Sequence, residues 1–145
     1  MLPVGVGTDI VYLPRVRAII ERWGGLRFAT RILSQKEIVE NRSLVNSWAF
    51  LASRYQHSVN EFLNSCYHHF RFASKEAVFK ALSGERRLLW REFAINRRSP
   101  LGSPTVCLPA DLEDKYKVFL SVSHDGDYVF ASALAINRVK DLDVI

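Results

Sequence analysis

Cysteine is scarce in this sequence, and no hydrophobic run is long. The two cysteines, Cys66 and Cys107, lie far apart and have no C-x-x-C or histidine-rich spacing beside them. This pattern argues against a zinc site and a disulfide framework, and it favours a reducing, intracellular compartment. The longest apolar run, from Tyr128 to Ile136, is too short to span a bilayer. We therefore expect no membrane segment.

Targeting signals are also missing from the first residues. Met1 and Leu2 lead directly into a strand-like segment, with no basic region ahead of a separate apolar stretch. An amphipathic, arginine-rich presequence is absent as well. We therefore expect no signal peptide, and any organellar targeting would have to be cryptic or to have been removed from this sequence.

The composition is that of a folded domain with an excess of positive charge. The 145 residues are 48% hydrophobic and 12% aromatic, enough to build one domain over residues 1–145 without disulfides or metals. The formal net charge of +5 favours an acidic partner: nucleic acid, a phosphorylated small molecule or an acidic protein. The alternative is that the basicity only aids solubility.

The first part of the chain is typical of a strand followed by short helices. Val4 to Val11 alternates branched apolar residues with Gly5 and Gly7, which predicts a strand that another backbone or a ligand can approach closely. Pro14 suits the first turn of a helix that stops at Gly24-Gly25. "LRFATRIL" and "SWAFLASRY" are further helical segments, and the capping-box pattern "SQKE" predicts the start of a short helix.

The second part begins with a helix and continues mostly as strands. Apolar residues surround nearly the whole circumference of a helix over Arg71–Leu82, which predicts a buried helix that ends at Ser83-Gly84. After it, "REFAINR", "TVCL", "KVFLSVSH" and "DYVFASALAI" predict strands, and "PADLEDKY" predicts a short helix. Asp125-Gly126 is a strong hairpin signal. The expected fold class is α+β, with helices packed on an antiparallel sheet.

Polar residues in separate segments suggest a site for phosphate chemistry. Glu76 and Lys80 share one narrow sector of the buried helix, and Asp9 stands near the end of the first strand. Two carboxylates without histidine or cysteine ligands suit Mg²⁺, which takes its remaining oxygens from water and a substrate phosphate. "SVSHDGDY" adds Ser121, Ser123 and His124 before the last hairpin. The residues alone leave simpler roles open: a surface ion pair for Glu76–Lys80, a helix cap for Asp9 and a solvated loop histidine for His124.

Several of these segments together resemble one family. The segments, in chain order, are "GVGTDIVYLPR", "RFATRILSQKE", "RFASKEAVFKAL" and "LSVSHDGDYVFASA". They are similar to the holo-acyl-carrier-protein synthase family of 4′-phosphopantetheinyl transferases, and the similarity spreads over most of the chain. The resemblance implies the 4′-phosphopantetheinyl transferase fold and an enzyme that moves the 4′-phosphopantetheine arm of coenzyme A onto a serine of apo acyl carrier protein. Adenosine 3′,5′-bisphosphate is released, and the product supports fatty acid biosynthesis.

The resemblance also implies roles for individual residues. Asp9 and Glu76 match the Mg²⁺ ligands of the family, and Lys80 matches the lysine at the pyrophosphate. Glu76, or a metal-bound water beside it, is the candidate base for the serine proton. The positions that match coenzyme A contacts are Arg71, Lys75, Lys80, Ser121, Ser123 and His124. The family resemblance places carrier-protein docking on the helix after Pro14, where basic residues gather at Arg15, Arg22, Arg27 and Arg31.

The sequence departs from the family pattern at three places. Tyr12 stands where members often carry a second acidic residue, so metal affinity and geometry could differ. A Gly-rich turn after the buried helix is reduced to Ser83-Gly84. The family run F-L-A-x-R-F-A-x-K-E-A is split by an insertion at about 55–71, and removal of the 17 residues from Tyr55 to Arg71 would restore "FLASRFASKEA". That length is not a whole number of helical turns, so the insertion is not expected to lengthen the helix in phase.

Two origins for the insertion and two compartments are open. The insertion is either a lineage-specific loop or the translation of a short retained intron. If introns are involved, the source is eukaryotic and the enzyme is expected to serve a mitochondrial acyl carrier protein; otherwise a bacterial cytoplasm is expected.

Partners and competing functions follow from the same residues. Family members of this size usually form homotrimers with sites between subunits, so a homotrimer that binds coenzyme A and an acidic acyl carrier protein is expected, without nucleic acid or membrane. One alternative is an inactive protein that binds coenzyme A or another partner, because the insertion lies beside Lys75-Glu76. A second alternative is a basic nucleic-acid-binding domain that uses Arg86, Arg87, Arg91, Arg97 and Arg98.

Overall fold

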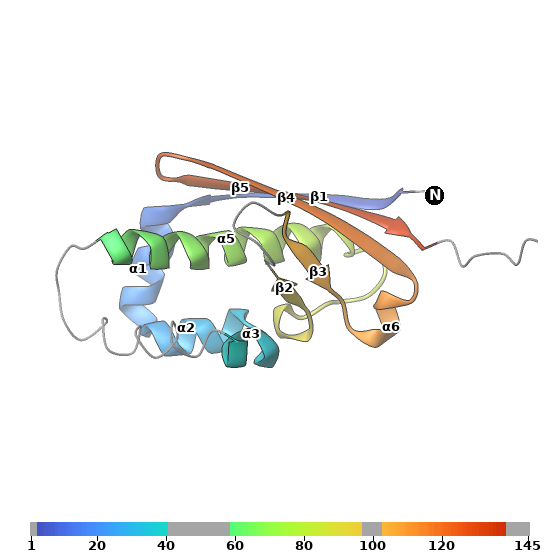
Figure 1. Cartoon of the computed structure of the whole chain (residues 1–145), viewed down its shortest axis with the longest axis horizontal. Helices are drawn as coiled ribbons and strands as arrows, with labels where there is room; N and C mark the ends of the chain where they lie inside the picture. Colours follow the sequence, from blue (N-terminus) through green and yellow to red (C-terminus); the bar gives the residue numbers. More distant parts are fainter. Residues whose placement is uncertain (1–2, 41–58, 97–102, 139–145) are drawn as a thin grey trace, which may run out of the picture.

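The computed structural model describes residues 3–40, 59–96 and 103–138, and their backbone forms an antiparallel sheet with helices on one side (Figure 1). Five strands follow one another across the sheet in the order β1-β5-β4-β3-β2. The strands are β1 (Pro3–Tyr12), β2 (Ala94–Asn96), β3 (Thr105–Cys107), β4 (Tyr116–Asp125) and β5 (Tyr128–Asn137). The helices are α1 (Leu13–Trp23), α2 (Gly25–Ile32), α3 (Gln35–Glu40), α5 (Val59–Ala81), η1 (Trp90–Glu92) and α6 (Ala110–Glu113). The predicted α+β class is confirmed.

Local signals in the first part of the chain fix the helix ends as predicted. Gly24 follows α1 with a φ of 84°, a left-handed conformation that favours glycine. The backbone nitrogen of Ser34 donates to Oε2 of Glu37 at 2.7 Å, and the backbone nitrogen of Glu37 donates to Oγ of Ser34 at 3.3 Å. These two reciprocal bonds form the capping box that starts α3.

The last two strands form the predicted hairpin. Their register pairs Asp125 with Tyr128, so the loop residues are Gly126 and Asp127, one position later than the expected turn. Gly126 has a φ of 50°, which the missing side chain permits. The carbonyl of Asp127 accepts a hydrogen bond from the backbone nitrogen of Leu13 at 2.8 Å, and this bond ties the hairpin to the start of α1.

Two expectations about element boundaries are corrected. Residues 59–71 form the first part of α5, so most of the expected insertion at 55–71 is helix continuous with the buried segment. The strand predicted from "REFAINR" is shorter, because Arg91 and Glu92 belong to η1 and pairing begins at Ala94. The predicted helix over "SWAFLASRY" lies outside the described residues.

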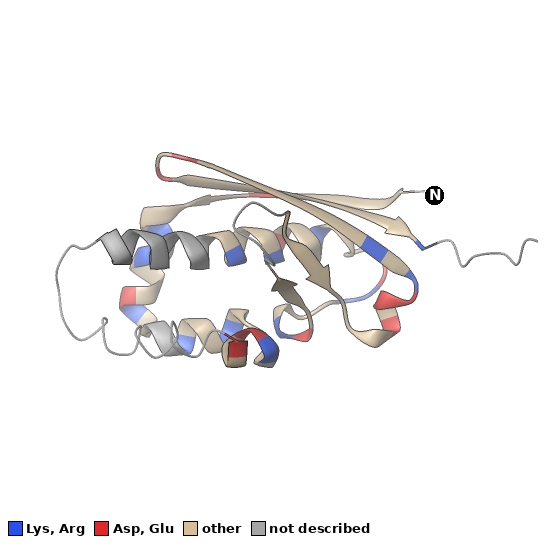
Figure 2. Ribbon diagram, in the orientation of Figure 1, with Lys and Arg blue, Asp and Glu red and all other residues tan. Residues whose placement is uncertain are grey.

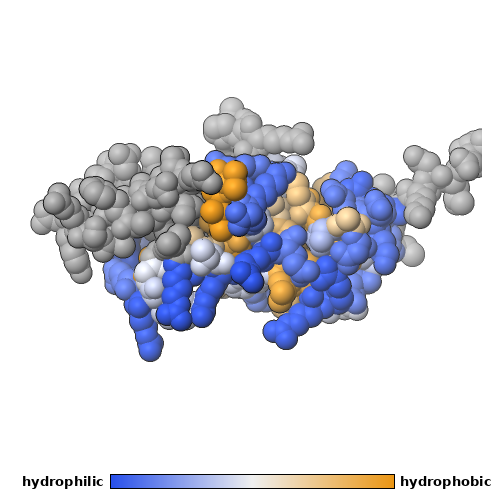
Figure 3. Space-filling view, turned by 90° about the horizontal axis from the view of Figure 1, so that it is seen from below, coloured by the Kyte–Doolittle hydropathy of each residue, from blue (hydrophilic) through white to orange (hydrophobic). Residues whose placement is uncertain are grey.

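The two faces of the sheet differ in what covers them. Ala131, Ala133 and Ala135 point towards α5 and are buried. The alternate residues point away from the helices, because successive side chains of a strand lie on opposite faces. The apolar residues on that side, which we call the outer face, are 38–65% exposed: Val6, Ile10, Tyr12, Phe119, Tyr128, Phe130 and Leu134. By contrast, the helix side seen in Figure 3 is largely hydrophilic, with smaller apolar areas between polar ones.

Two glycines bring the edge strand β1 against α5. A Cβ atom built on Gly7 would overlap the carbonyl oxygen of Ala77 and lie 2.6 Å from the backbone nitrogen of Ala81. One built on Gly5 would overlap the carbonyl oxygen of Ala81. Any side chain at these positions would force strand and helix apart. The glycine pattern predicted such a close backbone approach, and the structure confirms it.

Candidate active site

The edge of the sheet brings together three of the predicted site residues. Nζ of Lys80 lies 3.0 Å from Oδ1 of Asp9 and 3.8 Å from Oε1 of Glu76. The same ammonium donates to the backbone oxygen of Thr8 at 3.0 Å. Glu76 and Lys80 are one turn apart on α5, and Asp9 comes from β1, so the close packing of these two elements creates the cluster. Asp9 and Lys80, which are 71 positions apart in sequence, therefore lie in contact.

The cluster is accessible and suited to binding a cation. The side chains of Asp9, Glu76 and Lys80 are 15%, 26% and 43% exposed, so solvent reaches the group. The two carboxylates already share one positive charge, the ammonium of Lys80. Carboxylate oxygens with nearby solvent match what Mg²⁺ prefers, since it binds through one or two carboxylates and completes its shell with water and phosphate. In the part of the chain that is described, no larger group of histidine, cysteine or acidic ligands gathers.

Tyr12, the departure from the family's acidic position, does not face this cluster. It lies on the outer face, where its ring packs against Tyr128 at a centroid distance of 5.1 Å. Asp9 is three residues earlier in the same strand and belongs to the other face.

Arg71 and Lys75 do not lie at the cluster, and their predicted role as coenzyme A ligands stays a prediction. Lys75 is 0% exposed, and its Nζ lies 2.7 Å from Oε2 of Glu37. It also donates to the carbonyl oxygens of Trp90 at 2.6 Å and Phe93 at 2.7 Å. An ammonium has three protons to donate, and all three are used. Arg71 is 4% exposed and pairs with Glu37 as well. Neither cation can reach a phosphate at the surface in this conformation.

Glu37, the buried carboxylate of this network, was not singled out in the sequence. Its burial alone raises its pKa, but Lys75, Arg71 and the hydrogen bonds outweigh that effect, so the pKa falls below its ordinary value of 4.5. Burial lowers the pKa of Lys75 to about 8, against the opposing effect of Glu37. Both groups are therefore charged at neutral pH. Two features of the sequence could have pointed to this network: Glu37 is the glutamate of the capping box, and Arg71 and Lys75 are basic residues four positions apart on a largely apolar helix.

Ser121, Ser123 and His124 do not join the cluster within one chain. Ser121 pairs with Ser132, which pairs with Thr8, and this row of residues belongs to the outer face. Ser123 lies on that face too. His124 pairs with Val129, whose side chain points to the helix side, but the histidine itself is exposed and two strands away from β1. The sheet thus separates the two predicted serines from Asp9.

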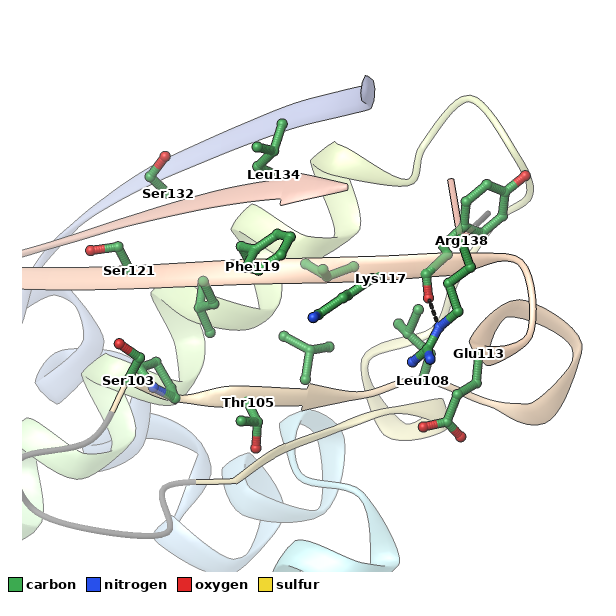
Figure 4. Close-up of a pocket in the computed structure, with 15 residues that line it drawn as sticks. Ser103, Thr105, Leu108, Glu113, Lys117, Phe119, Ser121, Ser132, Leu134 and Arg138 are labelled. Carbon is green, nitrogen blue, oxygen red and sulfur yellow. Dashed lines mark hydrogen bonds between the residues drawn. The ribbon is translucent and has the colours of Figure 1, made fainter. Parts of the chain in front are cut away.

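A groove of about 540 Å³ lies where β3 diverges from β4 (Figure 4). The two strands share one paired position, Thr105 with Phe119, which leaves space between them. Ser121 lines this groove, and Lys117 and Arg138 supply its positive charge. Nε of Arg138 is held by the carbonyl of Tyr116 at 3.2 Å. One predicted coenzyme A residue therefore lines a groove with cationic side chains.

The basic residues predicted for carrier-protein docking are at the surface. Arg15 and Arg22 on α1 and Arg27 on α2 are all exposed, and basic positions predominate on these two helices (Figure 2). The guanidinium of Arg31 lies 4.7 Å from the ring centroid of Trp23, which is 40% exposed. These helices therefore present a basic surface that includes an aromatic side chain.

The alternative of a nucleic-acid-binding domain loses one of its proposed contacts. Nε of Arg86 binds Oδ2 of Asp111 at 2.8 Å, and its Nη1 lies 3.2 Å from Oε1 of Glu92. Arg86 is thus neutralised by two acidic side chains. Arg97 and Arg98 lie outside the described residues.

Among the described helices, none has the length and apolar character that crossing a membrane requires.

Comparisons with known proteins agree with one another. The sequence model of the 4′-phosphopantetheinyl transferase superfamily matches residues 5–133. A holo-[acyl-carrier-protein] synthase of Ehrlichia canis is 31% identical over 135 residues, which cover 92% of this chain and 94% of the relative. The solved holo-[acyl-carrier-protein] synthase of Neisseria meningitidis is similar with a TM-score of 0.69 and 29% identity, over 93% of this chain and 99% of that one.

A further similar structure carries a nucleotide. The acyl carrier protein synthase of Plasmodium yoelii with ADP bound has a TM-score of 0.66 and 26% identity, over 92% of this chain and 95% of that one. The relatives from Ehrlichia and Neisseria are bacterial, and the comparisons do not support the expectation of a mitochondrial protein.

Proposed function

The chain belongs to the 4′-phosphopantetheinyl transferase superfamily, and from this we propose that it transfers the 4′-phosphopantetheine arm of coenzyme A to a serine of apo acyl carrier protein. The resemblance and the fold predicted from the sequence are confirmed. The observation that carries the proposal is the convergence of Asp9, Glu76 and Lys80 at the edge of the sheet. The names of the relatives and the ADP bound to one of them support the same reaction.

The proposed reaction requires no nucleophile from this chain. The hydroxyl oxygen of the carrier-protein serine attacks the phosphorus next to pantetheine, and the bond from that phosphorus to the bridging oxygen breaks. Adenosine 3′,5′-bisphosphate leaves with the bridging oxygen. Lys80, which is 43% exposed, can turn to the pyrophosphate and stabilise the charge that grows on the leaving phosphate. In this proposal, a carboxylate oxygen of Glu76, or a water molecule beside it, would accept the serine proton.

The two carboxylates fit a divalent cation. Asp9 and Glu76 would hold Mg²⁺, because they already share a single cation, the ammonium of Lys80, at a partly exposed position. When bound, the ion would neutralise charge on the pyrophosphate. With the carboxylates engaged in this way, Lys80 would be free to contact phosphate.

We further propose that the product supports fatty acid biosynthesis.

The carboxylate–lysine cluster and the predicted residues of β4 lie apart in one chain, but they can form one site if two copies of the chain meet. We propose that copies associate as a homotrimer through the outer face, so that Asp9, Glu76 and Lys80 of one copy approach Ser121 and His124 of a neighbour. The support is the set of large apolar side chains exposed on that face, among them Val6 and Ile10 at 65% and 62%. A contiguous apolar patch of this kind marks an interaction surface.

The first prediction concerns the carboxylates. Asp9→Asn and Glu76→Gln should each lower the transfer rate by about a hundredfold or more, because each removes a charge that acts in the transition state. The measurement is mass spectrometry of apo acyl carrier protein incubated with coenzyme A and Mg²⁺. Asp114→Asn, at an exposed position that follows α6, is the matched control and should keep the wild-type rate. Full activity in EDTA, or in either variant, would contradict the metal assignment.

The second prediction concerns assembly. Phe130 is 43% exposed on the outer face, and Phe130→Glu should convert a trimer into single chains, because it places a charge in an apolar interface. Sedimentation equilibrium measures the mass directly. Val39→Glu makes the same exchange at a residue that is 52% exposed on α3, and it should leave the trimer intact. A wild-type protein that sediments as one chain would refute the proposal of a trimer.

Docking of the carrier protein is proposed for the basic surface of α1 and α2. Acidic carrier proteins are attracted to such a surface, and charge complementarity speeds encounter and fixes orientation. Arg15, Arg22 and Arg27 are exposed there, as docking requires.

The third prediction tests this surface. Arg15→Glu should raise the KM for the carrier protein about tenfold or more, equivalent to about 1.4 kcal/mol, and leave the KM for coenzyme A nearly unchanged. The wild-type KM for the carrier protein should also rise with salt. Lys36→Glu makes the same reversal on α3 and should change neither constant. If Arg15→Glu changes neither KM, or weakens both equally, α1 is not the docking surface.

A further inference from the structure

We infer that Glu37 is a positioning residue for Glu76 and Lys80, an inference that rests on the proposed function. Glu37 lies on α3 and is 0% exposed. Its carboxylate accepts hydrogen bonds from the backbone nitrogens of Ser34 at 2.7 Å and Ile95 at 3.0 Å. It also pairs with Lys75 at 2.7 Å and with Arg71. One buried carboxylate therefore joins α3, α5 and β2.

The network fixes α5 immediately before the active-site residues. Arg71 and Lys75 are one turn apart and anchor the same side of the helix. Lys75 is also bonded to the carbonyls of Trp90 and Phe93, so its ammonium holds α5 against η1 and the residue that follows it. Arg71 donates to the carbonyl oxygen of Ile95 as well. These bonds limit both rotation of α5 about its axis and movement along it.

Glu76 is next in sequence to Lys75, so the position of one determines the position of the other. In an α-helix, adjacent residues differ by about 100° in direction and 1.5 Å in height. The glycine contact with β1 holds the opposite side of α5, next to Lys80. If Glu37 loses its charge, two cations remain buried without that carboxylate, and α5 is driven to move Lys75 towards water. Such a movement would carry Glu76 away from Asp9.

Stability alone does not explain why charges occupy this place. Apolar residues of similar volume can often replace a buried ion pair without loss of stability. The charged groups of this network differ from such residues because their directional bonds favour one arrangement of α5 relative to α3 and β2. A displacement of about 1 Å at reacting groups can reduce a rate a hundredfold. The network of Glu37, Arg71 and Lys75 lies beside Glu76 on α5, where a small displacement would have a large effect on the proposed transfer.

The test measures the geometry through metal affinity as well as through turnover. Mn²⁺ binding is followed by electron paramagnetic resonance in wild type, Glu37→Gln, Lys75→Met and the double variant, at a temperature where circular dichroism shows each one folded. We expect Glu37→Gln to raise the Kd for Mn²⁺ about tenfold and to lower kcat about a hundredfold, with the KM for the carrier protein unchanged. The double variant should lose no more than the worse single variant, because both residues act through one network.

Matched controls separate this effect from general changes of charge. Glu40→Gln and Lys36→Met make the same exchanges on the exposed part of α3, where the side chains are 48% and 54% exposed, and they should match wild type. If Glu37→Gln does not fold, Glu37→Asp decides the question, because it keeps the charge but shortens the side chain by one methylene. We expect it to bind Mn²⁺ more weakly than wild type.

The outcomes distinguish this inference from the proposed function. A folded Glu37→Gln, or Glu37→Asp in its place, with wild-type Mn²⁺ affinity and kcat would overturn the inference, even if its melting temperature fell. Absence of Mn²⁺ binding by the wild type would overturn it too. A wild type that binds Mn²⁺ through Glu76 but transfers nothing would overturn the proposed function alone, and the effect of Glu37→Gln on Mn²⁺ affinity would still decide the inference.

Discussion

The contact between β1 and α5 is the constraint on which the rest of the site depends. Gly5 and Gly7 let the strand lie against the backbone of Ala77 and Ala81, closer than any other residue would allow. At this separation the ammonium of Lys80 reaches both the carbonyl of Thr8 and the carboxylate of Asp9. A chain with side chains at these positions would hold Asp9 of β1 farther from Glu76 and Lys80 of α5.

The helix α5 has two charged regions with opposite surroundings. Arg71 and Lys75 are buried and are paired with Glu37, whereas Glu76 and Lys80 reach solvent at the sheet edge. Burial makes the first region stationary, because a buried cation cannot give up its partners without a large penalty. Exposure leaves the second region accessible to solvent, with Lys80 in contact with Asp9 and Glu76. One helix therefore combines a buried, ion-paired region with a solvent-exposed charged region.

Much of the fold could be predicted from the sequence because its signals are local. The capping box at Ser34, the stop at Gly24 and the hairpin near Gly126 each depend on residues only a few positions apart. The meeting of Asp9 with Glu76 and Lys80 is not local; residue chemistry and family resemblance predicted one site for the three residues, but not the ion pair between Asp9 and Lys80. Burial of Arg71 and Lys75 could not be predicted in this way, since their partner Glu37 lies more than thirty residues earlier and a basic side chain alone does not reveal whether it meets a carboxylate or a ligand. The faces on which Ser121 and Ser123 lie required the register of the sheet.

The most direct measurement is phosphopantetheine transfer by wild type and Lys80→Met, with Lys36→Met as the matched control. Mass spectrometry of apo acyl carrier protein, after incubation with coenzyme A and Mg²⁺, detects the added group on its serine. We expect the wild type and Lys36→Met to modify the carrier protein fully, and Lys80→Met to be slower by about a hundredfold while it keeps the wild-type melting temperature. Transfer by Lys80→Met at the wild-type rate, or no transfer by the wild type, would contradict the assignment of this cluster as the active site.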